Sequence, residues 1–152
     1  MIGINILITL LAFLGMEGVA WLTHKYVMHG WLWNLHADHH KKDHYNFLEK
    51  NDYFFLIFAV PGIICLFWGM HLHFNFLFWI GLGITIYGAA YFFIHDLFIH
   101  QRIKVMSKTR MGYFLAIRRA HKVHHKHTGK EEGECFGMLW VPLRYYKEYI
   151  NK

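Results

Sequence analysis

The sequence predicts an all-α integral membrane protein with about three transmembrane helices and a histidine-rich helical cap on the cytoplasmic side. At 152 residues the chain has the length of one domain, and we expect a single membrane-embedded domain over residues 1–152. Hydrophobic residues are 55% of the chain and charged residues only 17%, which excludes disorder and disfavours an ordinary soluble protein. The charges are also unevenly placed, because residues 53–94 contain none and residues 1–23 contain only Glu17.

Two long apolar segments set the expected spans. A helix needs about 20 apolar residues to cross the hydrocarbon core of a bilayer. Residues 2–23 therefore supply one span, and residues 53–94 supply two, at 53–70 and 75–94, joined by a short polar turn. The first segment has no basic start and no small-residue cleavage site, so we expect it to remain as an anchor rather than be removed as a signal peptide.

Lysine and arginine predict the orientation of these spans. Four of them lie in residues 25–52 and twelve follow Asp96, whereas the N-terminus and the turn at 71–75 have none. Because basic loops stay in the cytoplasm, residues 25–52 and everything after His95 are expected on that side. The apolar segment 136–143 is too short to cross a bilayer, so we expect it to lie on or pack under the membrane, where a fourth short helix would fit.

The basic C-terminal part of the chain does not indicate nucleic-acid binding. A basic face beside membrane spans is what topology and anionic lipids already require, and no nucleic-acid motif accompanies it. We therefore expect membrane lipid, and no nucleic acid, as a partner of this surface.

Histidine is the outlier in composition, with fourteen residues. Ten of them form two copies of one pattern, an H-x4-H followed by an H-x2-H-H, after the first span and again after the third. These ten are His24, His29, His36, His39, His40, His95, His100, His121, His124 and His125. On an α-helix the H-x2-H-H positions fall within about 100° of arc and face one side. The H-x4-H positions lie about 140° apart, so they share a site only by flanking it or through a local distortion of the helix.

The ten patterned histidines are candidate metal ligands, and the predicted topology places all of them at one membrane face. Each imidazole has a donor and an acceptor to satisfy, so ten would make a poor apolar core, whereas transition metals bind the lone pair directly. Ten ligands suit two metals with about five each better than one four-ligand structural zinc. Which five histidines bind which metal stays open. We expect His44, His71, His73 and His127 in hydrogen-bonded or surface roles.

Three carboxylates near the clusters are candidates to support the ligands. Glu17 lies inside the first span, where an ionisable group is a functional candidate, and direct ligation or helix pairing are its alternatives. Asp38 and Asp96 lie within the clusters. A carboxylate commonly orients a ligand imidazole through its other nitrogen, although a surface ion pair is an equally good interpretation.

The residues around the histidines resemble the bacterial β-carotene hydroxylases of the membrane fatty-acid-hydroxylase superfamily. The resemblance runs through nearly the whole chain. Its most specific stretches are GMEGVAWLTHKYVMHGW at 15–31, YGAAYFFIHDLFIHQR at 87–102 and AHKVHH at 120–125. The family's Gly-Phe-Leu-Tyr-Ala-Pro-like segment appears as GMLWVP at 137–142, a departure that bears on substrate detail.

This resemblance implies an O2-dependent monooxygenase of a bacterial inner membrane, with its active site on the cytoplasmic side. It would hydroxylate carbon 3 of β-ionone rings and convert β-carotene through cryptoxanthin to zeaxanthin, taking the carotenoid from the bilayer. The ten patterned histidines match the family's ligands to two non-haem iron ions, and zinc can occupy the same imidazoles on purification. The chain has no dinucleotide fingerprint and no CxxC motif, so an external electron donor, such as a ferredoxin and its reductase, is implied.

Two other functions stay open from the sequence. The same diiron chemistry could act on a sterol or a fatty acyl chain, because this histidine spacing recurs among such hydroxylases and desaturases. A non-enzyme alternative is a histidine-rich metal transporter or a haem protein of the membrane. A transporter should carry polar ligands at mid-membrane, and a haem needs only one or two axial histidines, so neither explains ten histidines at one face.

Overall fold

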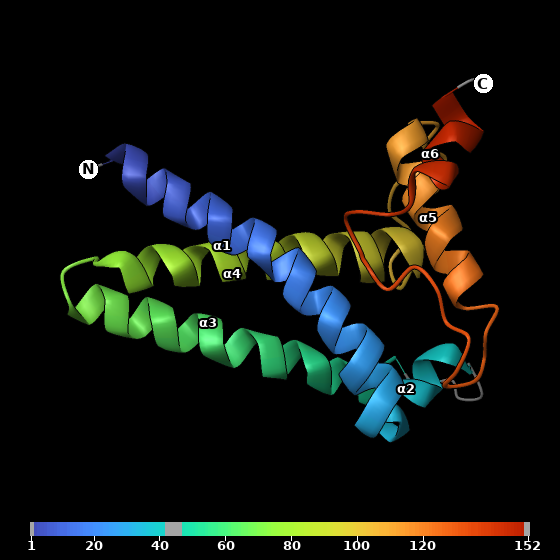
Figure 1. Cartoon of the computed structure of the whole chain (residues 1–152), viewed down its shortest axis with the longest axis horizontal. Coiled ribbons are helices and arrows are strands. Elements are labelled where there is room, and N and C mark those ends of the chain that lie inside the picture. Colours follow the sequence, from blue (N-terminus) through green and yellow to red (C-terminus); the bar gives the residue numbers. More distant parts are fainter. Residues whose placement is uncertain (1, 42–46, 151–152) are drawn as a thin grey trace.

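A computed structural model describes residues 2–41 and 47–150, and these residues form helices and loops with no β-strand (Figure 1). His44 lies outside the described residues. Two helices continue into π-helical segments, labelled η1 and η3, and η2 is a single 3-10 turn. The elements in order are α1 (Ile2–Leu22), η1 (Thr23–Trp31), α2 (Trp33–His40), η2 (Lys50–Asp52), α3 (Tyr53–His71), α4 (Phe76–Phe92), η3 (Phe93–Ile99), α5 (Gly112–His124) and α6 (Leu143–Ile150).

Three helical segments of the described chain are long and apolar enough to cross a membrane: Ile2–Trp31, Lys50–His71 and Phe76–Ile99. Most of their large apolar side chains are exposed, with Leu14 64% and Phe67 61% exposed. So much apolar surface is stable only when lipid covers it. The predicted all-α membrane fold with three spans is therefore confirmed, and the first and third helical segments run beyond the predicted ends into the histidine-rich residues.

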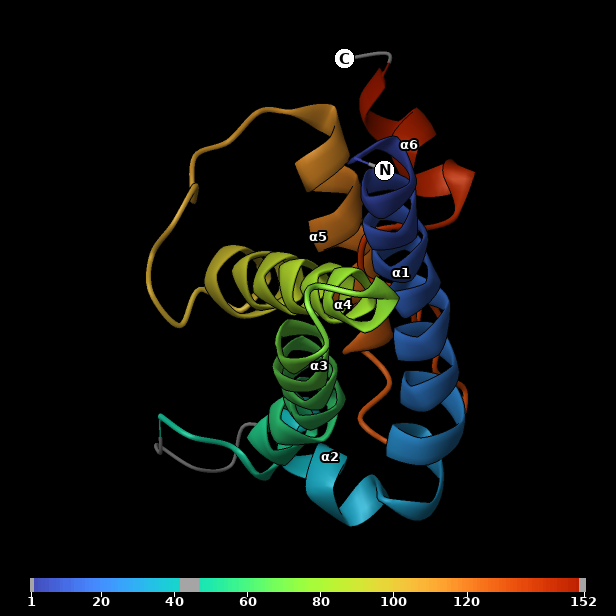
Figure 2. The same cartoon turned by 90° about the vertical axis from the view of Figure 1, so that its left-hand side faces the viewer.

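Helix α4 is the centre of the spanning bundle, with α1 and α3 packed against it (Figure 2). Glycines allow these close approaches. A Cβ at Gly83 would lie 2.5 Å from the carbonyl oxygen of Thr9 in α1, and one at Gly81 would lie 2.7 Å from the backbone nitrogen of Leu66 in α3. Small residues at these positions therefore bring the helix backbones together, as in other membrane bundles.

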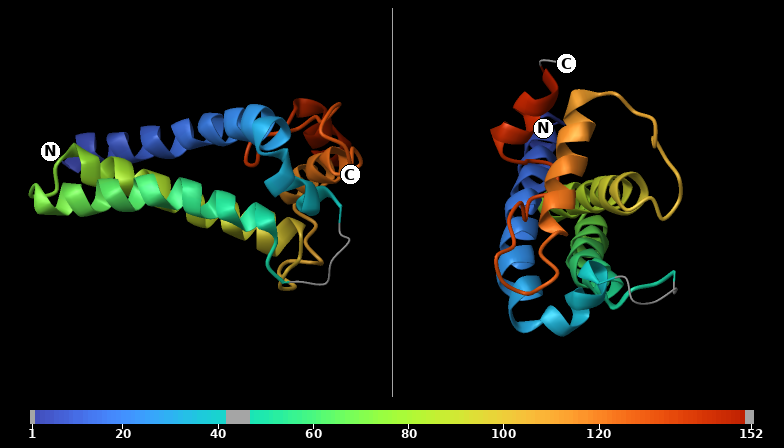
Figure 3. Two further views of the ribbon diagram at one scale, coloured as in Figure 1. Left: turned by 90° about the horizontal axis from the view of Figure 1, so that it is seen from below. Right: turned by 90° about the vertical axis from the view of Figure 1, so that its right-hand side faces the viewer.

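The α3–α4 turn and the cap lie at opposite ends of the bundle (Figure 3). At the turn, His73 and Phe74 adopt left-handed backbone conformations, and the Asn75 side chain accepts a hydrogen bond from the Leu77 N–H at 3.0 Å to start α4. The turn expected at 71–75 is confirmed. It places His71 and His73 far from the other described histidines, which lie at the cap end.

The cap has a small apolar core of its own between α5 and the loop that leads to α6. Ala116, Ile117 and Ala120 of α5 are buried together with Met138 and Val141 of that loop. The segment 136–143, expected to carry a short interfacial helix, is a loop in which Met138 and Val141 are buried and Trp140 is exposed, and the short helix α6 begins only at its end. The loop conformation has a physical cause, because the backbone N–H groups at 138–140 bond to Glu17 instead of to a helix.

Candidate metal centre

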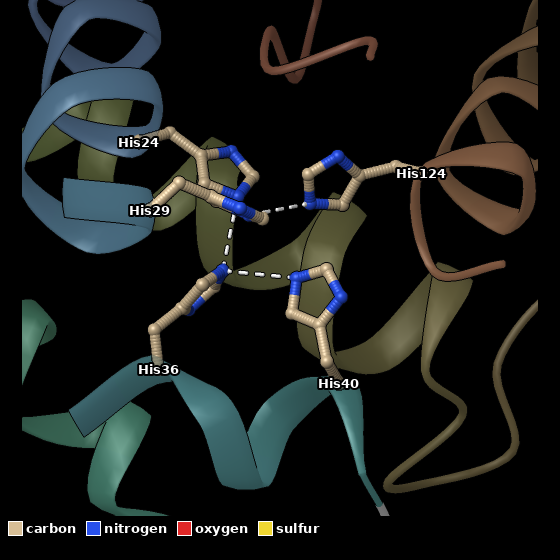
Figure 4. A group of neighbouring side chains, drawn as sticks. All are labelled: His24, His29, His36, His40 and His124. Atoms are coloured by element: carbon tan, nitrogen blue, oxygen red, sulfur yellow. Dashed lines mark hydrogen bonds between the residues drawn. The ribbon is translucent and has the colours of Figure 1, made fainter. Parts of the chain in front are cut away.

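The ten patterned histidines gather in two neighbouring groups at the cap end of the spans. In each group the candidate ligand atoms lie within 4.8 Å of one another. The first group is His24, His29, His36, His40 and His124 (Figure 4). The second group is His39, His95, His100 and His121, and His125 adjoins it with its Nε2 2.9 Å from the Nε2 of His121. The structure thus divides the ten residues into five and five.

Both groups are assembled by the same rule. The H-x4-H pair of each half of the chain stays together in one group, while the H-x2-H-H cluster divides. In α2, His36 and His40 belong to the first group and His39 belongs to the second. In α5 the arrangement is reversed, because His124 belongs to the first group and His121 to the second. The repeated sequence pattern is therefore a structural repeat in which each half lends one imidazole to the other.

A π-helical segment brings each H-x4-H pair to one side of its helix. In η3 the His100 N–H donates to the His95 carbonyl at 2.9 Å, and in η1 the Leu32 N–H donates to Val27 at 2.9 Å. These bonds join residues five apart, so such residues lie nearly above one another, whereas a regular α-helix would set them about 140° apart. Of the two options left by the sequence, the structure shows the distorted helix.

In the first group every Nδ1 atom faces an oxygen atom at 2.7–3.0 Å. Four of these oxygens are backbone carbonyls, and the fifth is the side-chain oxygen of Asn51. The pairs are His24 with Phe136, His29 with Lys130, His36 with Asn51, His40 with His127 and His124 with Glu134. Because these oxygens only accept, each Nδ1 carries the ring proton and each Nε2 keeps a bare lone pair.

These Nε2 atoms point at one another inside the group. Three pairs approach to 3.1–3.3 Å, namely His24 with His36, His36 with His40 and His29 with His124 (Figure 4). Two bare lone pairs form no hydrogen bond and repel at this separation, and a cation placed among them would remove this repulsion. Neutral imidazoles with the far nitrogen bonded to oxygen are also the usual form of metal-ligating histidine, so this donor set fits a transition-metal ion.

Burial keeps the imidazoles outside the spans neutral. It lowers the pKa of His36 to about 2, that of His124 to about 3 and that of His40 to about 4. Burial also lowers the pKa of His39 and of His121 well below the usual value, and neighbouring imidazoles lower both further. At neutral pH these rings carry no charge, and their lone pairs are available to a metal ion.

Carboxylates contact the second group. The Nδ1 of His39 lies 2.7 Å from Glu49 Oε2, and the Nδ1 of His95 lies 3.2 Å from Asp96 Oδ2. The Nδ1 of His121 is buried without a hydrogen-bond partner, while its Nε2 lies 2.9 Å from that of His100. Asp96 thus makes the kind of contact that its place in the cluster suggested, and the second group has a more acidic surrounding than the first.

A cavity of about 300 Å³ opens beside the second group. Its lining residues are His39, His40, Ile99, His100, His121, Lys122 and His125. Imidazoles of both groups reach it, because His40 belongs to the first group and stacks on His125 with ring centroids 4.5 Å apart. A small molecule in this cavity would therefore contact both halves of the histidine cluster.

Glu17 binds the loop between α5 and α6 and lies away from the imidazoles. Its Oε1 accepts the backbone N–H groups of residues 138–140 at 2.9–3.0 Å, and its Oε2 accepts the hydroxyl of Tyr87 at 2.7 Å. The same loop presents the carbonyls of Glu134 and Phe136 to two imidazoles of the first group. Glu17 therefore supports that group through the backbone of the loop.

The profile of the fatty acid hydroxylase family matches residues 9–143, which include all ten patterned histidines and most of the three spans. The chain belongs to the fatty acid hydroxylase family.

Curated members of this family with similar sequences are named for carotenoid chemistry. The chain is 41% identical to the beta-carotene hydroxylase of Pantoea ananas, over 91% of this chain and 78% of that protein. It is 39% identical to the beta-carotene hydroxylase of Paracoccus sp. (strain PC1), over 90% and 83%. It is 38% identical to the chloroplastic beta-carotene 3-hydroxylase 2 of Arabidopsis thaliana, over 86% of this chain and 43% of the plant protein. No solved structure matches the chain.

Several residues that support the ten histidines, directly or through another side chain, were not expected from the sequence. Glu49 and Asn51 lie in the turn before α3, with no spacing that relates them to His39 or His36. Arg102 was not expected either, although its place two residues after an H-x4-H is a signal that could have been used. The carbonyl acceptors had no signal at all, because every residue type offers a backbone oxygen.

The remaining candidates lie as follows. Asp38 Oδ2 accepts the Lys50 N–H at 2.6 Å, which ties α2 to the turn before α3. His127 supports the first group with its carbonyl, which accepts from His40 at 2.9 Å. His71 is exposed as the last residue of α3, next to the α3–α4 turn, and belongs to neither group.

Proposed function

We propose that this chain hydroxylates carbon 3 of carotenoid β-ionone rings, with O2 as co-substrate, at a centre of two iron ions held by the ten patterned histidines. The names of the bacterial and plant relatives support the substrate and the reaction. The observation that carries the metal assignment is the convergence of bare Nε2 lone pairs in the first group, which no hydrogen bond between neutral rings explains, beside a second cluster of imidazoles at similar spacing.

Bound iron supplies the redox chemistry that side-chain acids and bases lack, which is the reduction of O2 and the oxidation of an unactivated C–H bond. Each turnover consumes one O2, two electrons and two protons, places one oxygen atom in the product hydroxyl and releases the other as water. The protein's own contribution is to hold the five imidazoles of the first group in one tautomer through oxygen contacts and to keep both groups largely buried.

The substrate is proposed to reach this centre from the bilayer. A carotenoid is long and apolar, and the exposed apolar faces of the spans keep it in the same medium as the protein. Three imidazoles, those of His24, His29 and His95, belong to the ends of the spans themselves, since η1 and η3 continue α1 and α4, and His100 follows η3 directly. With the positive-inside orientation, the centre lies at the cytoplasmic surface of a bacterial inner membrane.

The electron donor is proposed to be a separate acidic protein, such as a ferredoxin, that docks on the cap. Basic residues of α5 and the turn after it are candidates for this contact. Arg118 stacks 4.0 Å from the Phe98 ring, and Arg119 lies 3.7 Å from Glu148 at a partly exposed position. Lys122 is exposed at the edge of the cavity beside the second group. Replacing Lys122 and Lys126 by Gln should raise the donor concentration needed for half-maximal activity, with unchanged metal content.

Pigment analysis in bacteria that accumulate β-carotene tests the proposed reaction. Cells with the wild-type chain should form cryptoxanthin and zeaxanthin. The His124→Ala variant should form neither, because it removes an imidazole of the first group and leaves a buried gap in the ligand set. His71→Ala is the matched control, since this histidine is exposed at the far end of the bundle, and it should retain wild-type conversion.

The outcomes separate the alternatives. Equal conversion by the His124→Ala variant would remove the ligand assignment. Unchanged β-carotene with an iron-loaded, membrane-inserted wild-type chain and a supplied donor would contradict carotenoid hydroxylation and favour a sterol or acyl substrate.

A further inference from the structure

The two histidine groups differ in the charge of the atoms that contact their outer nitrogens. In the first group all five Nδ1 partners are neutral oxygens, four from backbone carbonyls and one from Asn51. In the second group, His39 and His95 contact the carboxylates of Glu49 and Asp96. A carboxylate partner makes an imidazole a stronger donor to a metal ion than a neutral oxygen does.

Arg102 holds these carboxylates in place. Its Nε lies 3.0 Å from Asp96 Oδ1, and its Nη2 lies 3.3 Å from Glu49 Oε2. The other side of the fork takes Asp52 with two bonds, Nη1 to Oδ2 at 3.0 Å and Nη2 to Oδ1 at 2.7 Å. The arginine side chain is only 13% exposed and those of Glu49 and Asp96 10% and 12%, so the contacts are largely shielded from water.

The guanidinium is needed because three carboxylates would otherwise repel one another. The carboxylates of Glu49, Asp52 and Asp96 and the guanidinium of Arg102 carry a formal charge of −2 when these four described side chains are counted together. The partners of the first group carry a formal charge of zero. A surplus of negative charge in a poorly solvated place favours the binding of a divalent cation.

We propose that Arg102 is a positioning residue that orients Glu49 and Asp96 toward His39 and His95, so that the second group binds its divalent ion first and more tightly than the first group. This inference rests on the two-metal centre of the proposed function. It adds the order in which the two metal ions bind, and it attributes that order to Arg102 and its carboxylate partners, none of which is a proposed metal ligand.

The geometry of the network requires arginine. The three carboxylates are reached by Nε, Nη1 and Nη2 in one plane, and lysine offers a single nitrogen that cannot reproduce this fork. Arg102 is itself held by the backbone, since its N–H donates to the Asp96 carbonyl at 3.0 Å. Arg102 therefore fixes both the positions of the carboxylates and the net charge of this network.

Stepwise binding of Co²⁺ to the metal-free full-length protein in detergent tests the order, with the cobalt absorption bands and the metal content as readouts. The wild-type chain should bind two equivalents in two separable steps. Asp96→Asn keeps the shape and removes the charge behind His95, so it should weaken the first step about 10- to 100-fold and leave the second step unchanged. Arg102→Lys should weaken the first step by about 10-fold or more despite the retained charge.

The reciprocal substitution is available in the first group. Asn51→Asp is nearly isosteric and places a carboxylate 2.7 Å from the Nδ1 of His36, so it should tighten the second step about 10-fold or more and narrow the gap between the two. Misfolding cannot explain tighter metal binding in this variant. The helical circular dichroism signal of every variant should equal that of the wild type, which checks that each one is folded.

Three results would overturn the inference. The first is a weakened second step, with the first step intact, in Asp96→Asn. The second is a wild-type first step in Arg102→Lys. The third is a single cobalt equivalent in the wild-type protein, which would also remove the two-metal centre. Two ordered steps in a protein that makes no zeaxanthin would instead leave this inference standing and reject only the proposed substrate.

Discussion

Glu17 shows how a carboxylate inside a membrane span is used as an anchor for a backbone loop. One of its oxygens accepts three successive N–H groups, at residues 138–140, and the other accepts the hydroxyl of Tyr87 in α4. These groups would otherwise lack partners at the edge of a lipid environment, where unpaired polar groups are costly. The anchored loop supplies all four backbone carbonyls that fix the tautomers of the first histidine group.

Removing this anchor should loosen both the loop and the metal group. Glu17→Ala deletes four hydrogen bonds, and at about 1 kcal/mol each it should lower the free energy of unfolding by about 3–4 kcal/mol and reduce the bound metal. Unfolding in mixed detergent micelles and metal analysis measure the two effects.

Two conservative variants are the controls for Glu17. Glu17→Gln retains an accepting oxygen and should keep most of the stability, and Tyr87→Phe removes one bond and should cost about 1 kcal/mol. A Glu17→Ala protein as stable as the wild type, with full metal content, would contradict the anchoring role.

At the level of elements, two departures from the regular α-helix position the histidines. The π-helical segments η1 and η3 turn each H-x4-H pair to one side. The regular helices α2 and α5 need no distortion, because positions i, i+3 and i+4 already share a face, yet they send the middle histidine to the other group. The candidate ligands are thus presented by two π-helical segments, η1 and η3, and by two regular helices, α2 and α5.

The glycines of α4 set how closely the spans approach and can be tested one at a time. Gly83→Ala puts a Cβ 2.5 Å from the Thr9 carbonyl oxygen, so the α1 backbone must move away, at a cost of about 1–3 kcal/mol in the free energy of unfolding. Gly88→Ala is the control in the same helix, where nothing lies within 4 Å. That variant should be neutral or stabilised by up to about 1 kcal/mol, as measured by unfolding in mixed micelles. Equal losses in both variants would contradict a specific α1–α4 approach.

At the scale of the whole molecule, the two histidine groups connect halves of the cap that otherwise make few contacts. The α2 helix packs on η1 and η2, and α5 packs on α6 and η3, whereas α2 and α5 meet through their imidazoles, such as His40 stacked on His125. A ligand that binds only the folded state stabilises it by mass action, by about 2.7 kcal/mol at a free concentration of 100 times the dissociation constant.

Metal removal should therefore loosen the cap more than the membrane bundle. Chelation is expected to speed amide exchange in residues 33–40 and 121–127, measured by hydrogen–deuterium exchange, with little change in residues 76–90 of α4. Reloading with Zn²⁺ or Fe²⁺ should restore protection. Uniform loss of protection along the chain, or none, would contradict a cap held together by metal.

The orientation of the chain is also a property of the whole molecule. In a background with Cys65→Ser and Cys135→Ser, a cysteine at Leu72 should react with an impermeant thiol reagent added outside intact bacteria. A cysteine at Lys126 should react only after the membrane is opened, because the positive-inside rule predicts that the basic cap faces the cytoplasm. The reverse labelling pattern would place the candidate metal centre on the outer face.

Much of the architecture was predictable from the sequence because it depends on local properties. Hydropathy and charge placed the three spans, and the extended segments of the structure contain the predicted ranges to within one residue. Histidine spacing identified all ten residues that come together, because the spacing of residues along a helix determines which side chains lie on the same face. The segment 136–143 was the exception, because its backbone is held by a residue more than 120 positions away, Glu17.

The amino-acid sequence by itself determined a membrane-spanning helical bundle and the set of histidines at one of its ends, because apolar length and periodic spacing act within single elements. Only the tertiary structure decided how the ten imidazoles divide, which nitrogen of each ring in the first group keeps its lone pair and where Arg102 places its carboxylates. Those properties depend on contacts between distant segments, such as His24 with the carbonyl of Phe136, 112 residues away. A backbone carbonyl has no sequence signature, so its role appears only when folding brings it to the imidazole.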